Sequence, residues 1–210
     1  MSTTSTGSEI AEQGRNIIAL LAKQKVVRLD LGGGKNPVEG YLNVDICDFD
    51  GVDIVADLRR LDEVFPAKSV DAIMCRDVIP CFKATEIKGV MRRWARVLKP
   101  RSRFVLQVLD ARQLFEAYAE DRVVAPWTVD KIPLPGKKKE NDNGDKPTID
   151  WDKWKTYLYG PGRDEWTSFH NCYDEPYLRH IVESVGFEIQ QVDYPPLRIR
   201  FTMRRKEHKA

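Results

Sequence analysis

Cysteine is scarce in this chain, and its spacing suits neither disulfide nor metal chemistry. The 210 residues include four cysteines, Cys47, Cys75, Cys81 and Cys172, and no two of them form a CxxC pair. A metal site built from paired cysteines and a small domain held together by disulfides are therefore not expected. We predict that the thiols are reduced.

Long apolar runs and a strong charge imbalance are also missing. No stretch reaches the length that spans a bilayer, and the first residues, MSTTSTGSEI, lack the basic and apolar regions of a secretory signal. The net charge is only +2, which gives no general reason to expect a nucleic-acid partner. We predict a cytoplasmic protein with a flexible leader at residues 1–8 and a basic tail at residues 205–210.

What the chain does contain is an alternation of short apolar runs and longer amphipathic segments. The apolar runs predict strands at residues 26–31, 41–46, 52–58, 70–76, 102–110, 187–194 and 197–204. Helical spacing of apolar residues predicts helices at residues 9–24, 83–100, 111–120 and 175–187. This order predicts an α/β fold: a Rossmann-like, doubly wound, mostly parallel sheet with an antiparallel C-terminal edge strand and helices on both faces.

The alternation stops between about residues 121 and 165, a stretch rich in Pro, Lys, Asn and Gly. Aromatic residues gather near its end, at Trp151, Trp154, Tyr157 and Tyr159. A loop of this length inside a compact domain is usually a lid, a binding loop or disordered. We predict one domain over residues 9–204 that carries this segment as an insertion or lid.

Three consecutive glycines separate the first two predicted strands, in the stretch LDLGGGKNPVEGYLNVDI at residues 29–46. In a doubly wound sheet, ligands bind beyond the carboxyl ends of the strands. Gly32, Gly33 and Gly34 lie at such an end, where the lack of β-carbons allows positive φ angles and a close approach of a ligand to the main chain. Asp45, at the end of the next strand, is placed to accept hydrogen bonds from a ribose diol. The stretch therefore predicts a cofactor that contains a nucleoside.

Two known phosphate-binding patterns fit these glycines poorly. A P-loop requires GxxxxGK[ST], but Lys35 is followed by Asn36. A dinucleotide-binding GxGxxG motif matches Gly32 and Gly34, but Pro37 stands where its third glycine belongs. A nicotinamide-dependent oxidoreductase is weakened by this mismatch and stays open as a distant alternative.

The stretch DLGGGKNPVEGYLNVDI, followed by VADL, by SVDAIMCRDVI and by RVLKP, resembles class I S-adenosylmethionine-dependent methyltransferases. It is most similar to the type 11-like branch, which reads GxGxxP and then GYxNVDI. The resemblance covers residues 26–110, and residues 157–189 are similar to the late segment of the same branch. It implies methyl transfer with S-adenosylmethionine as cofactor.

The resemblance also implies cofactor-binding positions, all at or just after strand ends: Asp30, Gly32, Gly33, Gly34, Asp45, Asp57, Leu58 and Arg76. It places the first aspartate and the glycines around the methionine moiety, Asp45 at the ribose, and Asp57 with Leu58 near the adenine. Arg76 and the following Asp77 would face the sulfonium and the acceptor. For Asp57 there is an alternative role as the N-cap of a helix, because Asp is a favoured capping residue.

Three residues are candidates for the chemistry. A hydroxyl acceptor needs a base, and His170 in SFHNCYDEP can take a proton near neutral pH. Its alternative is a histidine that only packs in a loop. Asp77 and Asp110, each just after a predicted strand, are further candidate bases or acceptor ligands, and either could instead cap a helix. No adjacent carboxylate pair follows Asp110, so we predict no metal.

These observations predict O-methylation of a small polar acceptor, such as a sugar hydroxyl of a glycan or of a biosynthetic intermediate. The partner is then a small molecule or a glycan. A nucleic-acid or protein methyltransferase is the second hypothesis, supported by lysines at residues 137–139 and by the basic tail. A binding module that has lost catalysis is the third, because Pro80 and Cys81 replace a Glu-His pair of many relatives. The acceptor and the oligomeric state stay undetermined.

Overall fold

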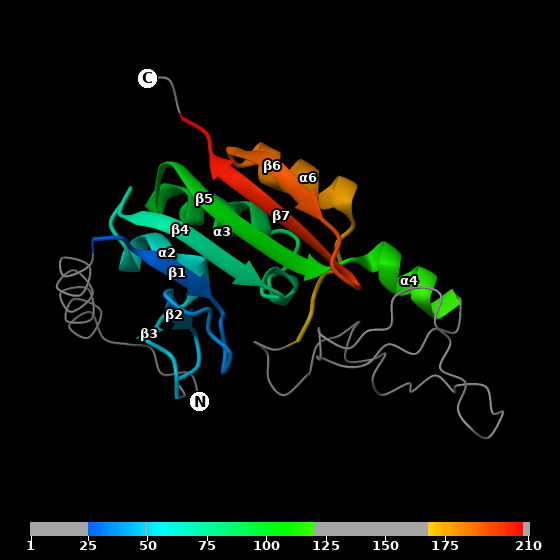
Figure 1. Cartoon of the computed structure of the whole chain (residues 1–210), viewed down its shortest axis with the longest axis horizontal. Helices are drawn as coiled ribbons and strands as arrows, with labels where there is room; N and C mark the ends of the chain where they lie inside the picture. Colours follow the sequence, from blue (N-terminus) through cyan, green and yellow to red (C-terminus); the bar gives the residue numbers. More distant parts are fainter. Residues whose placement is uncertain (1–24, 49, 120–167, 208–210) are drawn as a thin grey trace.

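The computed structural model describes residues 25–48, 50–119 and 168–207 (Figure 1). The predicted leader, the predicted helix at 9–24 and the predicted insertion with its aromatic residues lie outside the described residues. The last three residues of the predicted tail lie outside them as well.

The described strands form one seven-stranded sheet in the order β3-β2-β1-β4-β5-β7-β6 (Figure 1). They are β1 (Arg28–Leu31), β2 (Leu42–Asp45), β3 (Ile54–Val55), β4 (Val70–Arg76), β5 (Leu98–Leu109), β6 (Phe187–Asp193) and β7 (Arg198–Arg205). Strands β1 to β5 pair in parallel, and β7 is antiparallel to both β5 and β6. The α/β prediction is confirmed, with the antiparallel strand β7 one position inside the edge that β6 forms.

Local chemistry explains where the elements differ from their predicted bounds. Strand β3 has two residues because Gly51 takes a positive φ of 93° before it and Asp57 caps a short helical turn after it. The helix predicted at 83–100 spans Ile87–Val97 as α3, and Leu98 is already extended. A residue shortly before Pro100 cannot continue the helix into the proline without losing a hydrogen bond. Strand β5 therefore begins at Leu98.

The two faces of the sheet differ in polarity. Register places Leu31, Cys75, Leu106 and Phe201 side by side, and all four are fully buried. Helices α2 (Leu61–Val64), α3 and α6 (Glu175–Ser184) lie behind this face in Figure 1. The other face carries mostly polar and arginine side chains. Because neighbours along a strand point to opposite faces, one alternation builds both the core and the polar face.

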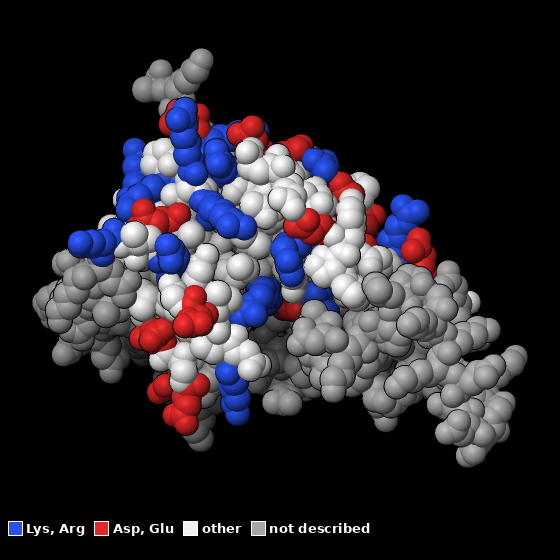
Figure 2. All heavy atoms as spheres, in the orientation of Figure 1, with Lys and Arg blue, Asp and Glu red and all other residues white. Residues whose placement is uncertain are grey.

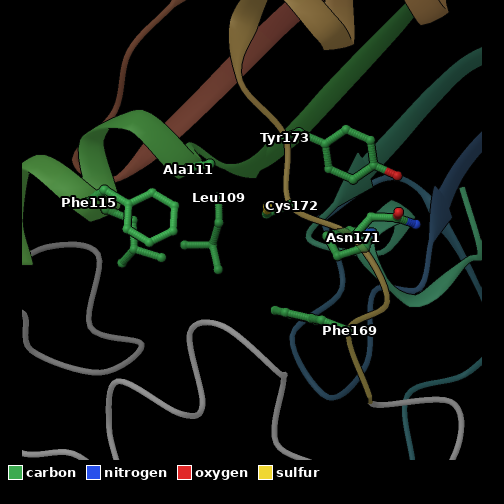
Figure 3. Close-up of a pocket in the computed structure, with 9 residues that line it drawn as sticks. Leu109, Ala111, Phe115, Phe169, Asn171, Cys172 and Tyr173 are labelled. Atoms are coloured by element: carbon green, nitrogen blue, oxygen red, sulfur yellow. The ribbon is translucent and has the colours of Figure 1, made fainter.

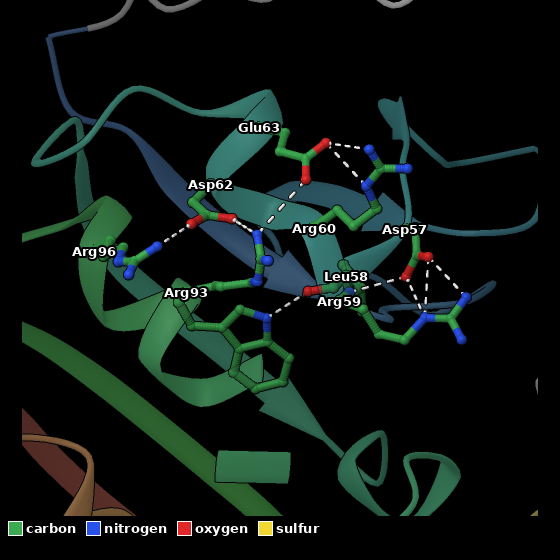
Figure 4. A network of polar contacts seen from close by, with 9 residues as sticks. Asp57, Leu58, Arg59, Arg60, Asp62, Glu63, Arg93 and Arg96 are labelled. Atoms are coloured by element: carbon green, nitrogen blue, oxygen red, sulfur yellow. Dashed lines mark hydrogen bonds and ion pairs between the residues drawn. The ribbon is translucent and has the colours of Figure 1, made fainter. Parts of the chain in front are cut away.

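Trp94 of α3 ties the helical layer to the sheet. Its ring is fully buried and lies edge-on to Phe82 and Phe104, with ring centroids 6.0 Å apart in each case. Its indole N–H donates to the carbonyl of Leu58 over 2.8 Å, so the one polar atom of the ring is satisfied. Around it, Arg93 and Arg96 of α3 hold Asp62 of α2 (Figure 4).

Candidate functional site

The glycine loop that follows β1 is shaped by close contacts. Gly32 and Gly34 have positive φ angles of 67° and 60°. A β-carbon on Gly32 would lie 2.3 Å from Cγ2 of Val78, and one on Gly33 would lie 2.6 Å from Oδ1 of Asn43. Only glycine fits the first two positions without displacing a neighbour. The loop therefore lies against the strand ends.

Asp30 lies beneath this loop and is fully buried. Its Oδ2 accepts from the main-chain N–H of Val38 over 2.8 Å and from Nη2 of Arg76 over 3.0 Å. The same Arg76 nitrogen also donates to the carbonyl of Asn36 over 2.7 Å. Asp30 and Arg76, which sequence reasoning assigned separately to the site, are thus joined in one ion pair on neighbouring strands.

Asn43 belongs to the same cluster, although sequence reasoning missed it. Its side chain is fully buried, and its Nδ2 donates to the carbonyls of Gly34 at 2.9 Å and Gly51 at 2.7 Å. It thereby fastens the glycine loop to the turn before β3. The available signal was an amide side chain in the middle of the predicted strand 41–46, where a buried polar group requires hydrogen-bond partners.

Asp45 ends β2 and faces the glycine loop. Its two carboxylate oxygens accept from the main-chain N–H of Gly34 at 3.3 Å and from that of Cys47 at 3.1 Å. The carboxylate is half-buried, so it can accept further hydrogen bonds from outside the chain. The structure thus brings Asp30, the glycines and Asp45 together at one edge of the sheet.

Asp57 caps the helical turn Leu58–Arg60, which confirms the capping alternative. Its side chain accepts from the main-chain N–H of Arg59 at 2.9 Å and pairs with the guanidinium of Arg59 at 2.7 Å (Figure 4). The side chain of Leu58 belongs to the hydrophobic core. The role of Asp57 and Leu58 near an adenine stays a prediction.

Asp77, directly after β4, is held in a left-handed conformation with φ of 57°. Its side chain is 17% exposed, and its Oδ2 accepts from Nε of Arg198, a residue of β7 that is itself 4% exposed. Burial raises the pKa of Asp77, while Arg198 and Arg76 oppose the rise. Sequence reasoning missed Arg198, because only the fold places β7 beside the end of β4.

Asp110 directly follows β5, and His170 lies in the segment before α6. Asp110 is buried, and its oxygens accept from the main-chain N–H of Arg112 at 3.0 Å and from Nε2 of Gln113 at 2.9 Å. It therefore caps α4 (Ala111–Ala119). His170 has an exposed side chain, and its main-chain N–H donates to the carbonyl of Pro80 at 2.7 Å.

An apolar pocket is lined in part by Phe169 and Asn171, the two sequence neighbours of His170 (Figure 3). Its walls include Leu109, Phe115 of α4 and Phe169, and Figure 3 shows the two phenylalanine rings on opposite sides. Asn171 and Tyr173 complete the wall on the side of the sheet. A flat or apolar part of a small molecule suits such a surface.

Among the described residues, four buried side-chain atoms have no hydrogen-bond partner, and all belong to residues of β1, β2 and β4 or to the residue directly after β4. They are Oδ1 of Asp30, Oδ1 of Asn43, Nε of Arg76 and Oδ1 of Asp77. Buried polar groups in native proteins almost always have a partner from the protein, from water or from a ligand. This concentration makes the carboxyl ends of β1, β2 and β4 the candidate functional site.

Groups outside this site add little. Within the described part of the chain, no cluster of three or more His, Cys, Asp or Glu side chains could hold a metal ion. No described helix has both the length and the apolar character needed to cross a membrane. None of the four cysteines, all of which are described, forms a disulfide.

Comparisons with known proteins agree with this arrangement. Among solved structures, a Pyrococcus horikoshii protein is similar with a TM-score of 0.55 and 18% identity, covering 97% of this chain and 93% of the other. A methyltransferase from Methanosarcina mazei, described as SAM-dependent, has a TM-score of 0.53 and 15% identity, covering 91% and 98%. The Burkholderia thailandensis 1,6-didemethyltoxoflavin-N1-methyltransferase, solved with its substrate and S-adenosylhomocysteine, has a TM-score of 0.54 and 13% identity, covering 94% and 78%.

At these identities the structural likeness supports the fold alone, and no curated protein matches the sequence. The family model gives the decisive comparison, because a model described as a methyltransferase domain matches residues 9–192, most of the chain. The chain therefore belongs to the methyltransferase-domain family, which confirms the resemblance to class I S-adenosylmethionine-dependent methyltransferases.

Proposed function

We propose that this methyltransferase transfers the methyl group of S-adenosylmethionine to a hydroxyl oxygen of a small polar acceptor, such as a sugar hydroxyl. The observation that carries the cofactor assignment is the presence of two buried, unpartnered acceptor atoms on residues that contact the glycine loop. Oδ1 of Asp30 and Oδ1 of Asn43 are acceptors, and an ammonium group such as that of the methionine moiety supplies donors.

The residues at this edge of the sheet fit the cofactor. The glycine loop allows a ligand close to the main chain, and the half-buried Asp45 can accept from a ribose diol. When bound, S-adenosylmethionine supplies an activated methyl group for in-line displacement. The protein then has to bind, orient and exclude water, with reacting atoms held about 3 Å apart.

His170 is our candidate for the base that takes the proton of the hydroxyl. Asp110 has both carboxylate oxygens engaged, and Asp77 has one oxygen held by Arg198. His170 has an exposed side chain, and its neighbours Phe169 and Asn171 line the apolar pocket. An acceptor in that pocket would bring its hydroxyl towards the imidazole, whose neutral form has a nitrogen that can accept the proton.

A mass-spectrometric screen tests this proposal. The protein is incubated with S-adenosylmethionine and a panel of sugars, phenols and hydroxy acids, and products are searched for one added methyl group. In His170→Ala we expect turnover to fall about 100-fold or more, with unchanged calorimetric affinity for S-adenosylhomocysteine. His180→Ala is the control, because His180 lies on α6 and contacts Lys88. A fully active His170→Ala variant would remove the base assignment.

One observation favours a nucleic-acid acceptor as the second candidate. Arg28, Arg103 and Arg204 are exposed, lie on the polar face of the sheet, and make no ion pair with any described residue. Such a row could bind a phosphate backbone. Binding of RNA or DNA oligonucleotides would then weaken steeply with added salt, and binding that is absent or insensitive to salt would exclude this candidate.

A further inference from the structure

Two arginines flank a glutamine in one row across the polar face of the sheet. Arg76 of β4 pairs in register with Gln107 of β5, and Gln107 pairs with Arg200 of β7. Since neighbouring strands lie about 4.8 Å apart, the outer two residues of this row are about 10 Å apart at their Cα atoms. Figure 2 shows Lys and Arg side chains gathered over β4, β5 and β7 on this face.

Arg200 differs from the other arginines near the site in what it contacts. Arg76 faces the carboxylate of Asp30, and Arg198 faces that of Asp77. Arg200 is half-buried, and its Nε and Nη2 both donate to Oε1 of Gln107, at 3.0 and 2.7 Å. Gln107 is neutral, so it orients the guanidinium without compensating its charge.

The nearest acidic candidate on the neighbouring strand does not compensate Arg200 either. Asp193 of β6 is the register partner of Arg200. Its Oδ1 accepts from the amide of Gln191 at 2.7 Å, and within the described ranges it makes no ion pair with Arg200. Among the described residues, the Arg200 guanidinium therefore has no carboxylate partner, and at least one of its N–H edges makes no hydrogen bond there.

Arg200 is also placed at the acceptor side of the site. The main-chain carbonyl of Gln107 accepts from the N–H of Asp77 at 2.8 Å, which fixes the end of β4 against this row. Two residues along β7, Arg198 pairs with Leu109, and Leu109 lines the apolar pocket. An apolar surface, the end of β4 and a guanidinium with no ion-pair partner in the described part of the chain thus follow one another along one face.

We propose that the methyl acceptor is an anion, a small hydroxyl-bearing carboxylic acid or phosphate ester, and that Arg200 binds its acidic group. This inference rests on the proposed function, since it names the substrate class of the same site. A guanidinium is suited to this task because its planar fork matches the two oxygens of a carboxylate or phosphate. Gln107 acts as a positioning residue that holds the fork in place.

Nuclear magnetic resonance titration of the ¹⁵N-labelled full chain, saturated with S-adenosylhomocysteine, tests the proposal. The side-chain Nε–Hε signal of Arg200 is identified by its loss in Arg200→Gln. Benzoate, phenyl phosphate and neutral benzamide are then added separately. We expect benzoate or phenyl phosphate to shift this signal saturably and benzamide to leave it in place, and the stronger of the two anions reports whether the acid is a carboxylate or a phosphate.

Variants at single arginines test whether the anion binds to the guanidinium of Arg200. Affinity for the preferred anion, followed on main-chain signals, should fall about 10-fold or more in Arg200→Gln, while Arg200→Lys should recover part of it because the charge returns without the fork. Arg101→Gln is the control, because Arg101 is exposed, lies outside both arginine rows and pairs with Glu207. Unchanged affinity in Arg200→Gln, an equal loss in Arg101→Gln, or no response to either anion would overturn the proposal.

Calorimetry separates failure of this inference from failure of the proposed function. If wild-type protein does not bind S-adenosylhomocysteine, the cofactor assignment fails and the acceptor proposal falls with it. If S-adenosylhomocysteine binds normally to wild type and to Arg200→Gln but the anions do not discriminate between them, only the acidic acceptor is refuted.

Discussion

Replacing Gly33 with alanine tests the glycine loop directly, because this position combines an ordinary φ angle with severe crowding. A β-carbon there would lie 2.6 Å from Oδ1 of Asn43 and 2.7 Å from Oδ2 of Asp30. Both distances are shorter than the 3.0 Å below which real β-carbons are essentially never found. Both neighbours are fully buried, so neither side chain can swing into solvent.

The magnitude follows from what has to move. Overpacking of a buried site costs about 1–3 kcal/mol. Displacing Asp30 also strains its contacts with Val38 and Arg76, and hydrogen bonds to charged groups contribute about 1.5–3 kcal/mol each. We therefore expect Gly33→Ala to lose about 2–4 kcal/mol in the free energy of unfolding if the loop keeps its place. If the loop moves instead, the cost appears as weaker cofactor binding.

Chemical denaturation measures the loss of stability, and calorimetric titration with S-adenosylhomocysteine measures the loss of cofactor binding. Gly34→Ala is a matched control for backbone strain alone, since Gly34 has a positive φ of 60° and a β-carbon there would meet nothing within 4 Å. We expect it to cost about 1–2 kcal/mol. Gly89→Ala controls for the substitution itself, because it lies in α3 with open space around it and should gain up to about 1 kcal/mol.

The reasoning would be refuted by a Gly33→Ala variant that unfolds within about 0.5 kcal/mol of wild type, the range of ordinary surface substitutions, and also binds S-adenosylhomocysteine normally. That result would mean that the loop does not lie against Asp30 and Asn43 in solution. A loss in Gly34→Ala as large as in Gly33→Ala would instead assign the effect to backbone conformation and remove the steric argument.

Two further predictions concern the polar contacts beside β3 and α3. Asp57→Ala should lose the cap and about 1 kcal/mol of stability, whereas Asp57→Ser should keep both. We expect both variants to bind S-adenosylhomocysteine more weakly than wild type in calorimetry. Normal binding by Asp57→Ser would leave Asp57 with a capping role only. Burial alone would raise the pKa of Asp62, but hydrogen bonds from Arg93 and Arg96 outweigh it and lower that pKa. Arg93→Gln should therefore cost about 1 kcal/mol at neutral pH, and the difference from wild type should vanish as the pH falls below 3.8 and through the lowered pKa. Denaturation at several pH values checks this, and a difference that persists in acid would contradict it.

The strand pattern was predictable where local signals agree. Strand β4 has the predicted bounds, 70–76, because its apolar alternation ends at Asp77, which takes a left-handed conformation. The final hairpin was also predictable, since Pro195 and Pro196 leave room only for a tight link between two alternating runs. Strand β3 was predicted too long, because the apolar run at 52–58 does not show that Gly51 takes a positive φ before it and that Asp57 caps a helical turn after it.

The site was predictable only in part, for a related physical reason. Asp30, Gly32 and Asp45 sit at strand ends, and parallel strands bring such ends to one edge of the sheet. Asn43 lies inside β2 and Arg198 begins β7, and the partners of both depend on which strands become neighbours. The sequence shows that they are polar at positions next to buried residues, but the partner of Arg198 is 121 residues away, at Asp77.

Strand β7 lies between β5 and β6, and this position brings arginines to the candidate site. The run LRIRFTMR alternates arginine and apolar residues, so one face of β7 completes the core while the other presents arginines. Because β7 runs antiparallel to β5, its first residues lie at the carboxyl edge, beside the end of β4. Arg198 and Arg200 thereby reach the side of β4 opposite to the glycine loop. The residues of β1 and β2 that we propose for the cofactor and the arginines on β7 then meet at Arg76 and Asp77, where we propose that methyl transfer occurs.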